Sequence, residues 1–573
     1  MGIVVVDPVT RIEGHLRVEA ELDATGTITR ASSCGTMVRG IEKIMQGRDP
    51  RDAWAFTQRI CGVCTTSHGI ASVRAVEDAL KIAIPENAEI IRNLMNGAQY
   101  IQDHVVHFYH LHAMDWVDVL SALSADPAET ARIQQCISRW PNNSVEHFAA
   151  AQQKLKGFAD TGQLGIFNNG YWGHPEYKLP PEINLLAVTH YLEALAWQRD
   201  IAKVHAIFGG KNPHPSFAVG GMPSAISTLG DATAVNVSKL GLVGEIIAQA
   251  RTFVDQVYIP DLLAIARFYK DWATKGEGLG NFLAFGDFPQ YDVNDESTFF
   301  FPRGAILDRD LRNVLSVDLN DTAQVQELIS HSWYDYSGGK EAALHPYEGE
   351  TKPRYSGPTS AYTNLDLEAE YSWLKSPRWR GYPMEVGPLA RVLIMFAQGN
   401  EVVQEVVNSV LSELKLPLGA LFSTLGRTAA RGIECKVLAD QMPVWHERLM
   451  SNIADGNLTV FDDNRFRPGT WPVQAQGVGF LEAPRGALAH WIVINNGRIG
   501  NYQAVVPTTW NAGPRDHNGL EGPYDAALKG HTLQDPGQPL EILRTIHSFD
   551  PCMGCAVHLS DPEGQSLLTV QIQ

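Results

Sequence analysis

RICGVC, at residues 59–64, and DPCMGC, at residues 550–555, each carry two cysteines three positions apart, near opposite ends of the chain. The four residues concerned are Cys61, Cys64, Cys552 and Cys555. Two such pairs supply four thiolates, which suit zinc, an iron–sulfur cluster or another thiophilic metal. We therefore expect one compact unit whose first and last segments meet around a metal site.

The composition is that of a large, acidic, ordered protein. Its 573 residues are 44% hydrophobic and 19% charged, enough to bury a large core. The formal net charge of -18 repels nucleic-acid phosphates, so we expect no nucleic-acid partner. No uncharged apolar run approaches the ~20 residues of a membrane span. The N-terminus lacks the basic region and cleavage site of a signal peptide, so these features alone favour the cytoplasm.

The remaining cysteines argue against a disulfide scaffold. Seven cysteines is a small and odd number for a chain of this length. We expect the three isolated ones to be small buried hydrophobic residues; they are Cys34, Cys136 and Cys435.

Long helices are predicted by hydrophobic residues that recur in steps of three and four. Residues 86–120 and 235–258 have this pattern, and 388–414 and 419–453 are further candidates. Pro260 is expected to kink or end the second helix. Several helices of this length predict a bundle.

Strands are expected toward the two ends of the chain. HLRVEAEL (15–22) alternates, and HWIVINNGRIGNYQAVV (490–506) reads as strand, Asn-Gly turn and strand. Residues 272–380 are rich in Gly, Pro, Asp and Tyr and are expected to be irregular. The predicted fold class is α+β and predominantly helical, with a central bundle of long helices and small peripheral antiparallel sheets. We expect a single domain built from 1–85 (strands and first cysteine pair), 86–270 and 388–455 (bundle), 272–380 (irregular) and 477–558 (strands and second cysteine pair).

Structural zinc is the common explanation for four cysteines in two pairs. Here the pairs are separated by hundreds of residues, whereas zinc modules usually close a short local loop. His68 and His558 lie close to the pairs, a more polar setting than a structural site requires. A chain of this length also needs no metal to fold.

Longer stretches of the sequence resemble the large subunit of nickel–iron hydrogenases, and most closely the membrane-bound respiratory H2-uptake enzymes. The resemblance covers essentially the whole chain. The matching stretches are DPVTRIEGH (7–15), RGIEKI (39–44), RICGVCTTSH (59–68), DHVVHFYHLHAMDWVD (103–118), GYWGHPEYKLPPE (170–182), FGGKNPHP (208–215), MEVGPLAR (384–391), FLEAPRG (480–486), NYQAVVPTTWNAGPR (501–515) and HSFDPCMGCAVH (547–558).

This resemblance implies a nickel–iron centre held by the four cysteines. Cys61 and Cys552 would bind nickel alone, and Cys64 and Cys555 would bridge nickel to an iron that carries carbon monoxide and two cyanides. Soft sulfur ligands stabilise low-valent nickel. The resemblance also implies a second ion near the C-terminus, magnesium or another divalent cation. Its ligands would be Glu42, the carbonyl of Ala504 and His558.

Heterolytic cleavage of H2 needs a base beside the metals. By resemblance the base is Cys552 or Arg485. A guanidinium is almost always protonated, so the favoured role for Arg485 is to orient and electrostatically stabilise the reacting groups. An isolated arginine more often forms a surface salt bridge. The resemblance gives Arg485 the carboxylate partners Asp103 and Asp550, with Pro484 completing the pocket wall.

Further roles follow from the resemblance for residues around the metals. Glu13 would be the first proton relay, exchanging protons with Cys552; without the motif a surface acid is equally plausible. Thr508 and the Arg485 backbone would hydrogen-bond the cyanides. His68 would hydrogen-bond a bridging sulfur rather than bind metal. The histidines of the 103–118 stretch are expected to pack and hydrogen-bond rather than bind metal; they are His104, His107, His110 and His112.

The three isolated cysteines are too few for an iron–sulfur cluster held by four thiolates, so a separate small subunit must carry the clusters. We expect a heterodimer, or a dimer of heterodimers, with a membrane cytochrome beyond it. The resemblance implies a membrane-associated enzyme on the periplasmic face, exported with the small subunit. It also implies that a maturation endopeptidase cuts after His558 once chaperones have inserted nickel, removing 559–573; the plainer interpretation of this segment is a last strand.

Two rival functions belong to other classes. The quinone-binding subunit of respiratory complex I has the same fold but lacks both cysteine pairs. A scaffold held by structural zinc would contain zinc and no nickel.

Overall fold

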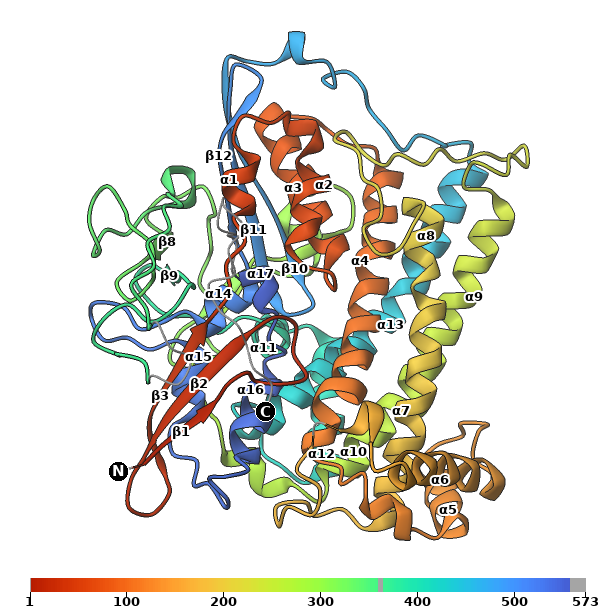
Figure 1. The fold of residues 1–573 in the computed structure, drawn as a ribbon. Helices are drawn as coiled ribbons and strands as arrows, with labels where there is room; N and C mark the ends of the chain where they lie inside the picture. The colour runs from red at the N-terminus through yellow and green to blue at the C-terminus, as the bar shows by residue number, and fades with distance from the viewer. Residues whose placement is uncertain (1, 169, 359–363, 557–573) are drawn as a thin grey trace.

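The computed structural model describes residues 2–168, 170–358 and 364–556. Long helices run side by side as a bundle on one side of the molecule, and two three-stranded sheets lie on the other side (Figure 1). The main bundle helices are α4 (Glu86–Val106), α7 (Pro181–Ile201), α9 (Val237–Phe253) and α13 (Thr424–Ala454). The predicted α+β class with a central bundle is confirmed.

Side-chain caps fix where two of these helices begin. The Asn236 side chain accepts a hydrogen bond from the backbone N–H of Lys239 at the start of α9. Ser423 does the same for Gly426 at the start of α13. Each cap satisfies an N–H group that has no partner within its own helix.

Two predicted helices continue through a wider π turn. After α4 the chain forms a π-helix (His107–His112) and a short 3-10 turn (Ala113–Asp115). After α9 a π-helix (Val254–Tyr258) leads into α10 (Ile259–Ala266). Pro260 lies in the first turn of α10, so it does not end the helical path. A proline lacks the N–H that an uninterrupted helix would use, and its first-turn position avoids that loss.

The predicted helix 388–414 is two helices, α11 (Pro388–Ala397) and α12 (Glu401–Leu414). Gly399 adopts a positive φ of 81° between them, which a continuous helix excludes. Asn400 then accepts a hydrogen bond from the Val403 N–H and starts the second helix. The prediction of a single helix was wrong because these two residues form a stop and a cap.

The two three-stranded sheets are antiparallel. The first is β1 (Gly2–Val6), β2 (Leu16–Leu22) and β3 (Ile28–Gly35). The second is β10 (Gln474–Ala483), β11 (Gly486–Asn495) and β12 (Arg498–Val505), and α3 (Thr65–Leu80) packs on β10. The predicted strand 15–22 and the Asn-Gly hairpin are confirmed, whereas β1, β3 and β10 were not predicted.

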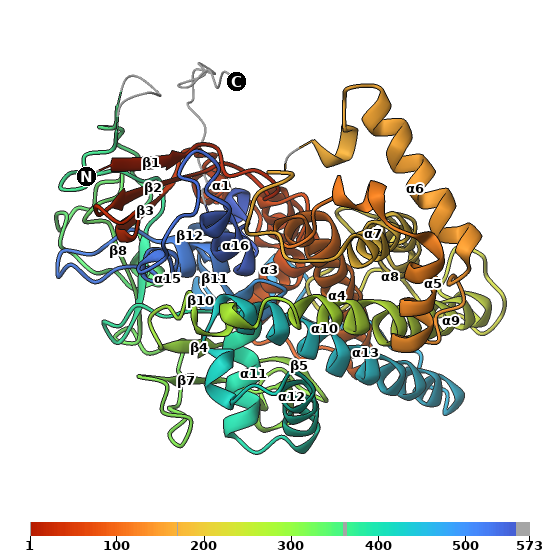
Figure 2. The same ribbon diagram turned by 90° about the horizontal axis from the view of Figure 1, so that it is seen from below.

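Residues 272–380 form loops and short strand pairs, as predicted. The pairs are β4 (Phe282–Ala284) with β7 (Gly304–Ile306), β5 (Asp287–Pro289) with β6 (Phe299–Phe301), and β8 (Val325–Leu328) with β9 (Ser376–Trp379). Seen from below, α11 lies beside β4 (Figure 2). The other helices are α1 (Ile41–Met45), α2 (Ala53–Thr57), α5 (Pro127–Ile137), α6 (Val145–Asp160), α8 (Lys203–Gly209), α14 (Pro507–Ala512), α15 (Pro523–Leu528), α16 (Leu540–Ser548) and α17 (Met553–Ala556).

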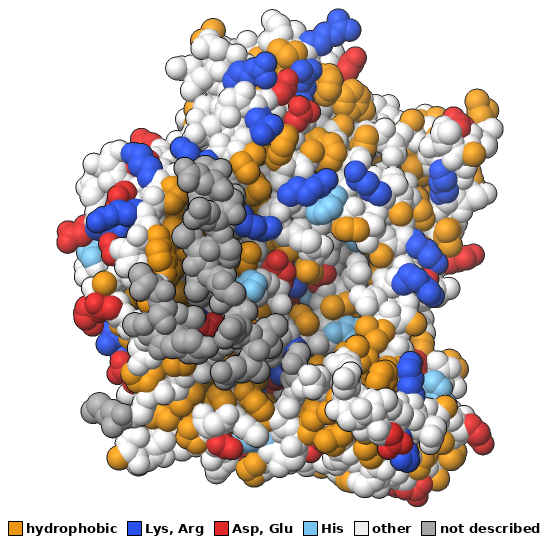
Figure 3. All heavy atoms as spheres, viewed as in Figure 1, with side chains coloured by type: hydrophobic (Ala, Val, Ile, Leu, Met, Phe, Trp, Pro, Cys, Tyr) orange, Lys and Arg blue, Asp and Glu red, His pale blue; other side chains and the backbone are white. Residues whose placement is uncertain are grey.

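The surface carries mixed charge. On the face seen in Figure 3, acidic, basic and hydrophobic side chains are interspersed. Within the described ranges, no helix has both the length and the apolar character needed to cross a membrane.

Candidate metal centre

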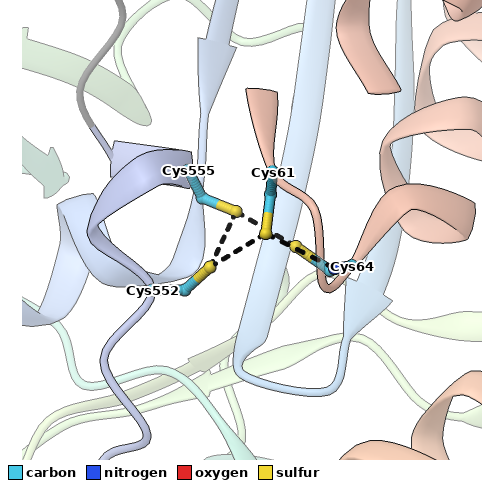
Figure 4. Close-up of side chains that lie close together, drawn as sticks. All are labelled: Cys61, Cys64, Cys552 and Cys555. Carbon is cyan, nitrogen blue, oxygen red and sulfur yellow. Dashed lines mark hydrogen bonds between the residues drawn. The ribbon is translucent and has the colours of Figure 1, made fainter. Parts of the chain in front are cut away.

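The four cysteines of the two pairs converge at the junction of the chain's two ends (Figure 4). Cys61 follows the 3-10 turn Gln58–Ile60, and Cys64 immediately precedes α3. Cys552 precedes α17, and Cys555 lies within it. Helix α3 and the C-terminal turn therefore hold the two pairs face to face.

The four sulfurs form one buried cluster. The Cys61 and Cys552 sulfurs are 3.3 Å apart, those of Cys64 and Cys555 3.0 Å, and those of Cys552 and Cys555 3.1 Å. All four lie within 4.8 Å of one another. These distances exceed the ~2.05 Å of a disulfide bond, and every cysteine is free. Four convergent soft donors fit a thiophilic metal centre.

The thiols differ in acidity because they share one buried volume. Burial alone would raise the pKa of Cys61, but hydrogen bonds from the other three thiols and the charge of Arg485 hold it well below the ordinary value. Burial and the neighbouring thiols raise the pKa values of Cys552 and Cys555 well above theirs. The backbone N–H groups of Val63 and Cys64 also point at the Cys61 sulfur, at 3.2 and 3.4 Å. This environment favours negative charge at Cys61.

Glu13 ties the N-terminal segment to the cluster. Its carboxylate accepts a hydrogen bond from the Gly554 N–H at 2.6 Å and lies 3.4 Å from the Cys552 sulfur. A Cβ on Gly554 would lie 2.2 Å from a Glu13 carboxylate oxygen, so this approach requires glycine. Burial raises the pKa of Glu13, and negative charge at Cys61 raises it further. A carboxyl with a raised pKa beside a sulfur is suited to proton exchange.

Arg485 lies between two carboxylates at the buried edge of the cluster. One guanidinium nitrogen is 3.0 Å from Asp103, and another is 3.1 Å from Asp550. Burial raises the pKa of Asp103 to about 7 against the opposing charge of Arg485. Burial works against the charge of Arg485, yet Asp550, Cys552 and Asp103 together raise its pKa well above the ordinary value. The guanidinium is therefore a fixed cation here.

A cavity of about 10 Å³ adjoins the sulfurs. It is lined by Cys64, His68, Ala483, Arg485, Leu488, Pro507, Thr508, Cys552 and Cys555. Pro484, expected in the wall, is absent from this lining, and its carbonyl instead accepts a hydrogen bond from Arg391 at 2.9 Å. Thr508 accepts a hydrogen bond from the Cys552 N–H at 3.0 Å. The His68 Nε2 atom lies 3.3 Å from the Cys555 sulfur, and burial lowers the pKa of His68 to about 4.

The expected ligands of the second ion are only partly described. The Glu42 carboxylate is buried and accepts hydrogen bonds from the Ala504 N–H, at 3.0 Å, and from the Thr351 hydroxyl. This contact uses the amide of Ala504, and the role of its carbonyl as a ligand of the ion stays a prediction. The Lys375 ammonium lies 4.0 Å from Glu42. His558 lies outside the described residues, as does 559–573.

The histidines predicted to pack and hydrogen-bond each have such a contact. His104 meets Glu434 at 2.7 Å, His107 the carbonyl of His547 at 2.6 Å, and His110 that of Tyr191 at 3.1 Å. His112, with Asp115 and His547, forms a second group of side chains of the kind that bind metal. Of the isolated cysteines, Cys34 and Cys435 are buried as predicted, but Cys136 is exposed on α5, so that prediction was wrong for it.

Sequence reasoning missed two sets of polar residues near the cluster. Lys375 contacts Glu327 at 3.1 Å and Gln503 at 2.8 Å beside Glu42. His490 and Tyr502 lie behind His68 on β11 and β12. Lys375 and Tyr502 have polar neighbours and no motif of their own, and the only available signal was His490 beside the hydrophobic run WIVI.

Comparison with known proteins gives matches over the whole chain. The family described as nickel-dependent hydrogenase matches residues 39–558, and one described as HoxL-like matches 3–34. The uptake hydrogenase large subunit of Rhizobium leguminosarum bv. viciae is 53% identical, over 100% of this chain and 97% of the relative. The Hydrogenase-1 large chain of Escherichia coli (strain K12) is 51% identical, over 99% and 97%. The reduced Ni-Fe-Se hydrogenase from D. vulgaris Hildenborough is similar in structure, with a TM-score of 0.75 and 31% identity over 97% of this chain and 100% of that one.

Proposed function

The chain belongs to the nickel-dependent hydrogenases as a large subunit that serves H2 oxidation, and from that premise we propose that its four clustered cysteines hold a nickel–iron centre. The observation that carries this proposal is the convergence of four buried, free sulfurs within 4.8 Å, contributed by both ends of the chain. Cys61 and Cys552 would bind nickel alone, and Cys64 and Cys555 would bridge to iron. The iron would carry carbon monoxide and two cyanides, with the Thr508 side chain and the Arg485 backbone as hydrogen-bonding partners. When bound, the centre supplies the heterolytic cleavage of H2.

Glu13 is proposed to carry the released proton away from the site. Its carboxylate is 3.4 Å from the Cys552 sulfur, a distance at which a proton can pass with a small movement of either group. The pKa of Glu13 is raised by burial, so the carboxyl can hold a proton transiently. The Gly554 N–H fixes the carboxylate in this position.

Arg485 is proposed to orient and electrostatically stabilise the reacting groups. It is buried beside the cavity and held by Asp103 and Asp550 on two sides. A planar guanidinium held by two carboxylates has a fixed direction. Because its pKa is raised, we favour this role over that of a base, which falls to Cys552. Pro484 would support the wall from behind through the position of its backbone.

A divalent cation, magnesium or a related ion, is proposed at Glu42 together with the backbone carbonyl of Ala504 and with His558. The buried carboxylate of Glu42 supports this proposal, since an oxygen ligand is what magnesium prefers. Chaperones would first insert nickel, and a maturation endopeptidase would then remove 559–573. This cut would complete a single-domain subunit.

We also propose an iron–sulfur small subunit as the obligate partner. H2 oxidation releases two electrons, and among the described residues no second group of cysteines gathers. The heterodimer would pass electrons to a membrane cytochrome on the periplasmic face, having been exported with the small subunit. Cell fractionation with both subunits produced together tests this location, and a soluble cytoplasmic enzyme would count against it.

The direct test of function is H2-dependent dye reduction by the chain purified with its small subunit. We expect the heterodimer to oxidise H2 and reduce the dye. The isolated chain should pass no electrons to the dye. Absence of H2 oxidation in a heterodimer that contains nickel would contradict the proposed function.

A further inference from the structure

A row of buried polar side chains leads away from the Cys555 sulfur. His68 Nε2 lies 3.3 Å from that sulfur, and His68 Nδ1 lies 3.1 Å from His490 Nε2. His490 Nδ1 is 2.7 Å from the Tyr502 hydroxyl, which is 3.1 Å from the Ser72 hydroxyl. All four side chains behind the sulfur are at most 1% exposed. Both ring nitrogens of both histidines are therefore engaged.

Three rigid elements hold this row in place. His68 and Ser72 lie one turn apart on α3, His490 lies on β11 and Tyr502 on the neighbouring β12. The rings of His68 and His490 are stacked, with centroids 5.3 Å apart and planes at 29°. Because α3 packs on this sheet, the row starts and ends on the same helix. These contacts from α3, β11 and β12 fix the ring plane of His68 relative to the sulfur.

The row also decides which nitrogen of His68 carries hydrogen toward Cys555. In an imidazole, the partner of one nitrogen sets the protonation of the other. A thiolate sulfur accepts hydrogen bonds, and hydroxyl hydrogens rotate to suit their partners. His68 donates to the sulfur when His490 donates to His68 through Nε2, which leaves His490 Nδ1 as the acceptor that faces the Tyr502 hydroxyl.

We propose that His490, Tyr502 and Ser72 are positioning residues that hold the His68 Nε2–H on the Cys555 sulfur. The inference rests on the proposed function, in which this sulfur bridges nickel and iron. A hydrogen bond withdraws electron density from a thiolate, and hydrogen bonds to sulfur ligands tune metal centres. Losing the bond makes the sulfur a stronger donor, which lowers the stretching frequency of carbon monoxide on iron.

The test is the infrared spectrum of the purified heterodimer carrying Tyr502→Phe, with Ser72→Ala as a second variant. We expect nickel content to be kept and the carbon monoxide band to move to lower frequency, in the same direction as in His68→Gln but by less. In a His68→Gln background, Tyr502→Phe should add no further shift, which a merely structural role would not predict. Tyr177→Phe is the control, because that hydroxyl donates to the Met114 carbonyl at 2.8 Å and has no link to the cluster.

An unchanged band in both Tyr502→Phe and Ser72→Ala would overturn the inference while leaving the proposed function intact. An equal shift with and without His68 would also overturn it. A wild-type heterodimer without carbon monoxide and cyanide bands would overturn both.

Discussion

The sulfurs of the four paired cysteines and the ligand atoms of His112, Asp115 and His547 form two groups with the side chains of a metal site. In both, all ligand atoms lie within 4.8 Å and every residue is buried. The cysteine group joins the two ends of the chain, whereas the histidine group joins the end of the bundle to α16. Burial and closeness are thus the same in the two groups, and neither feature distinguishes them.

The difference lies in what the donor atoms already bind. Both nitrogens of His112 are engaged, by Asp115 at 3.1 Å and by Thr428 at 2.9 Å. His547 meets Asp115 at 2.6 Å and the Thr10 carbonyl at 2.8 Å. Asp115 also receives the guanidinium of Arg11 at 2.5 Å, so a cation is already present.

The sulfurs, in contrast, face mainly one another and a small cavity. A metal at the histidine group would have to displace several satisfied hydrogen bonds and an ion pair. A metal at the cysteine group would displace none of comparable strength. Availability of lone pairs, in addition to the softness of sulfur, therefore separates the two groups.

The largest expected effect is loss of the metal on changing a sulfur. Cys552→Ser replaces a thiolate by a harder and poorer ligand for nickel, so nickel should be almost completely lost. His112→Gln is the matched change in the other group and should leave nickel content unchanged. Elemental analysis of the two purified heterodimers measures both. Equal loss of nickel in the two variants would erase the distinction between the groups.

The next effect separates proton transfer from metal binding at the cysteine group. Glu13→Gln keeps the shape of the side chain but removes its titration, so H2 turnover and H/D exchange with solvent should fall by about 10²- to 10⁴-fold. Nickel content and infrared bands should persist, since no metal ligand changes. Glu21→Gln, at a half-buried position near the end of the central strand β2, is the control. Near-normal exchange in Glu13→Gln would remove Glu13 from the proton route.

A smaller loss is expected for the buried arginine. Arg485→Lys keeps the charge, but an ammonium cannot reproduce the planar contacts to Asp103 and Asp550. Turnover should fall by roughly 10- to 100-fold with the metals retained. Arg74→Lys, in a similarly buried pairing with Glu89 and Asp287, should lose stability rather than turnover at fixed metal content. Steady-state assays with metal analysis distinguish the two, and equal turnover losses would contradict the role of Arg485.

The smallest effect concerns the histidine group and pH. Burial lowers the pKa of His112 to about 4 even though Asp115 opposes the shift. Between about pH 6.5 and 4, His112 is protonated in the unfolded chain and neutral in the folded chain. Stability therefore falls as pH falls from about 6.5 toward 4. His112→Gln should reduce this loss of stability at acid pH by up to about 3 kcal/mol. Thermal unfolding of the heterodimer between pH 7.5 and 4.5 measures it, and an unaltered pH slope would show that His112 is not buried in its neutral form.

The sequence predicted the parts of the fold that depend on periodic burial. The hydrophobic stripes gave the bundle, and Asn496-Gly497 gave the hairpin between β11 and β12. Prediction from the sequence failed at Gly399, where one residue changes the backbone direction. It also failed for β10, a strand that is stabilised by packing on α3. These outcomes depend on tertiary contacts that a local pattern does not contain.

The candidate site divides in the same way. The paired cysteines, Glu13 and Arg485 lie in distinctive motifs, and the structure brings them close together. The contacts of Lys375 and of His490 arise from residues far apart in the chain, each without a motif of its own. Cys136 shows a further limit of prediction from sequence. A cysteine on an amphipathic helix can face the core or the solvent, and this one is exposed.

Metal quantitation of the purified heterodimer, combined with infrared spectroscopy, tests the nickel–iron assignment of the four cysteines most directly. We predict nickel equimolar with the chain, no zinc, and infrared bands from carbon monoxide and cyanide. Zinc in place of nickel, with no such bands, would contradict the assignment and identify the cysteine group as a structural site.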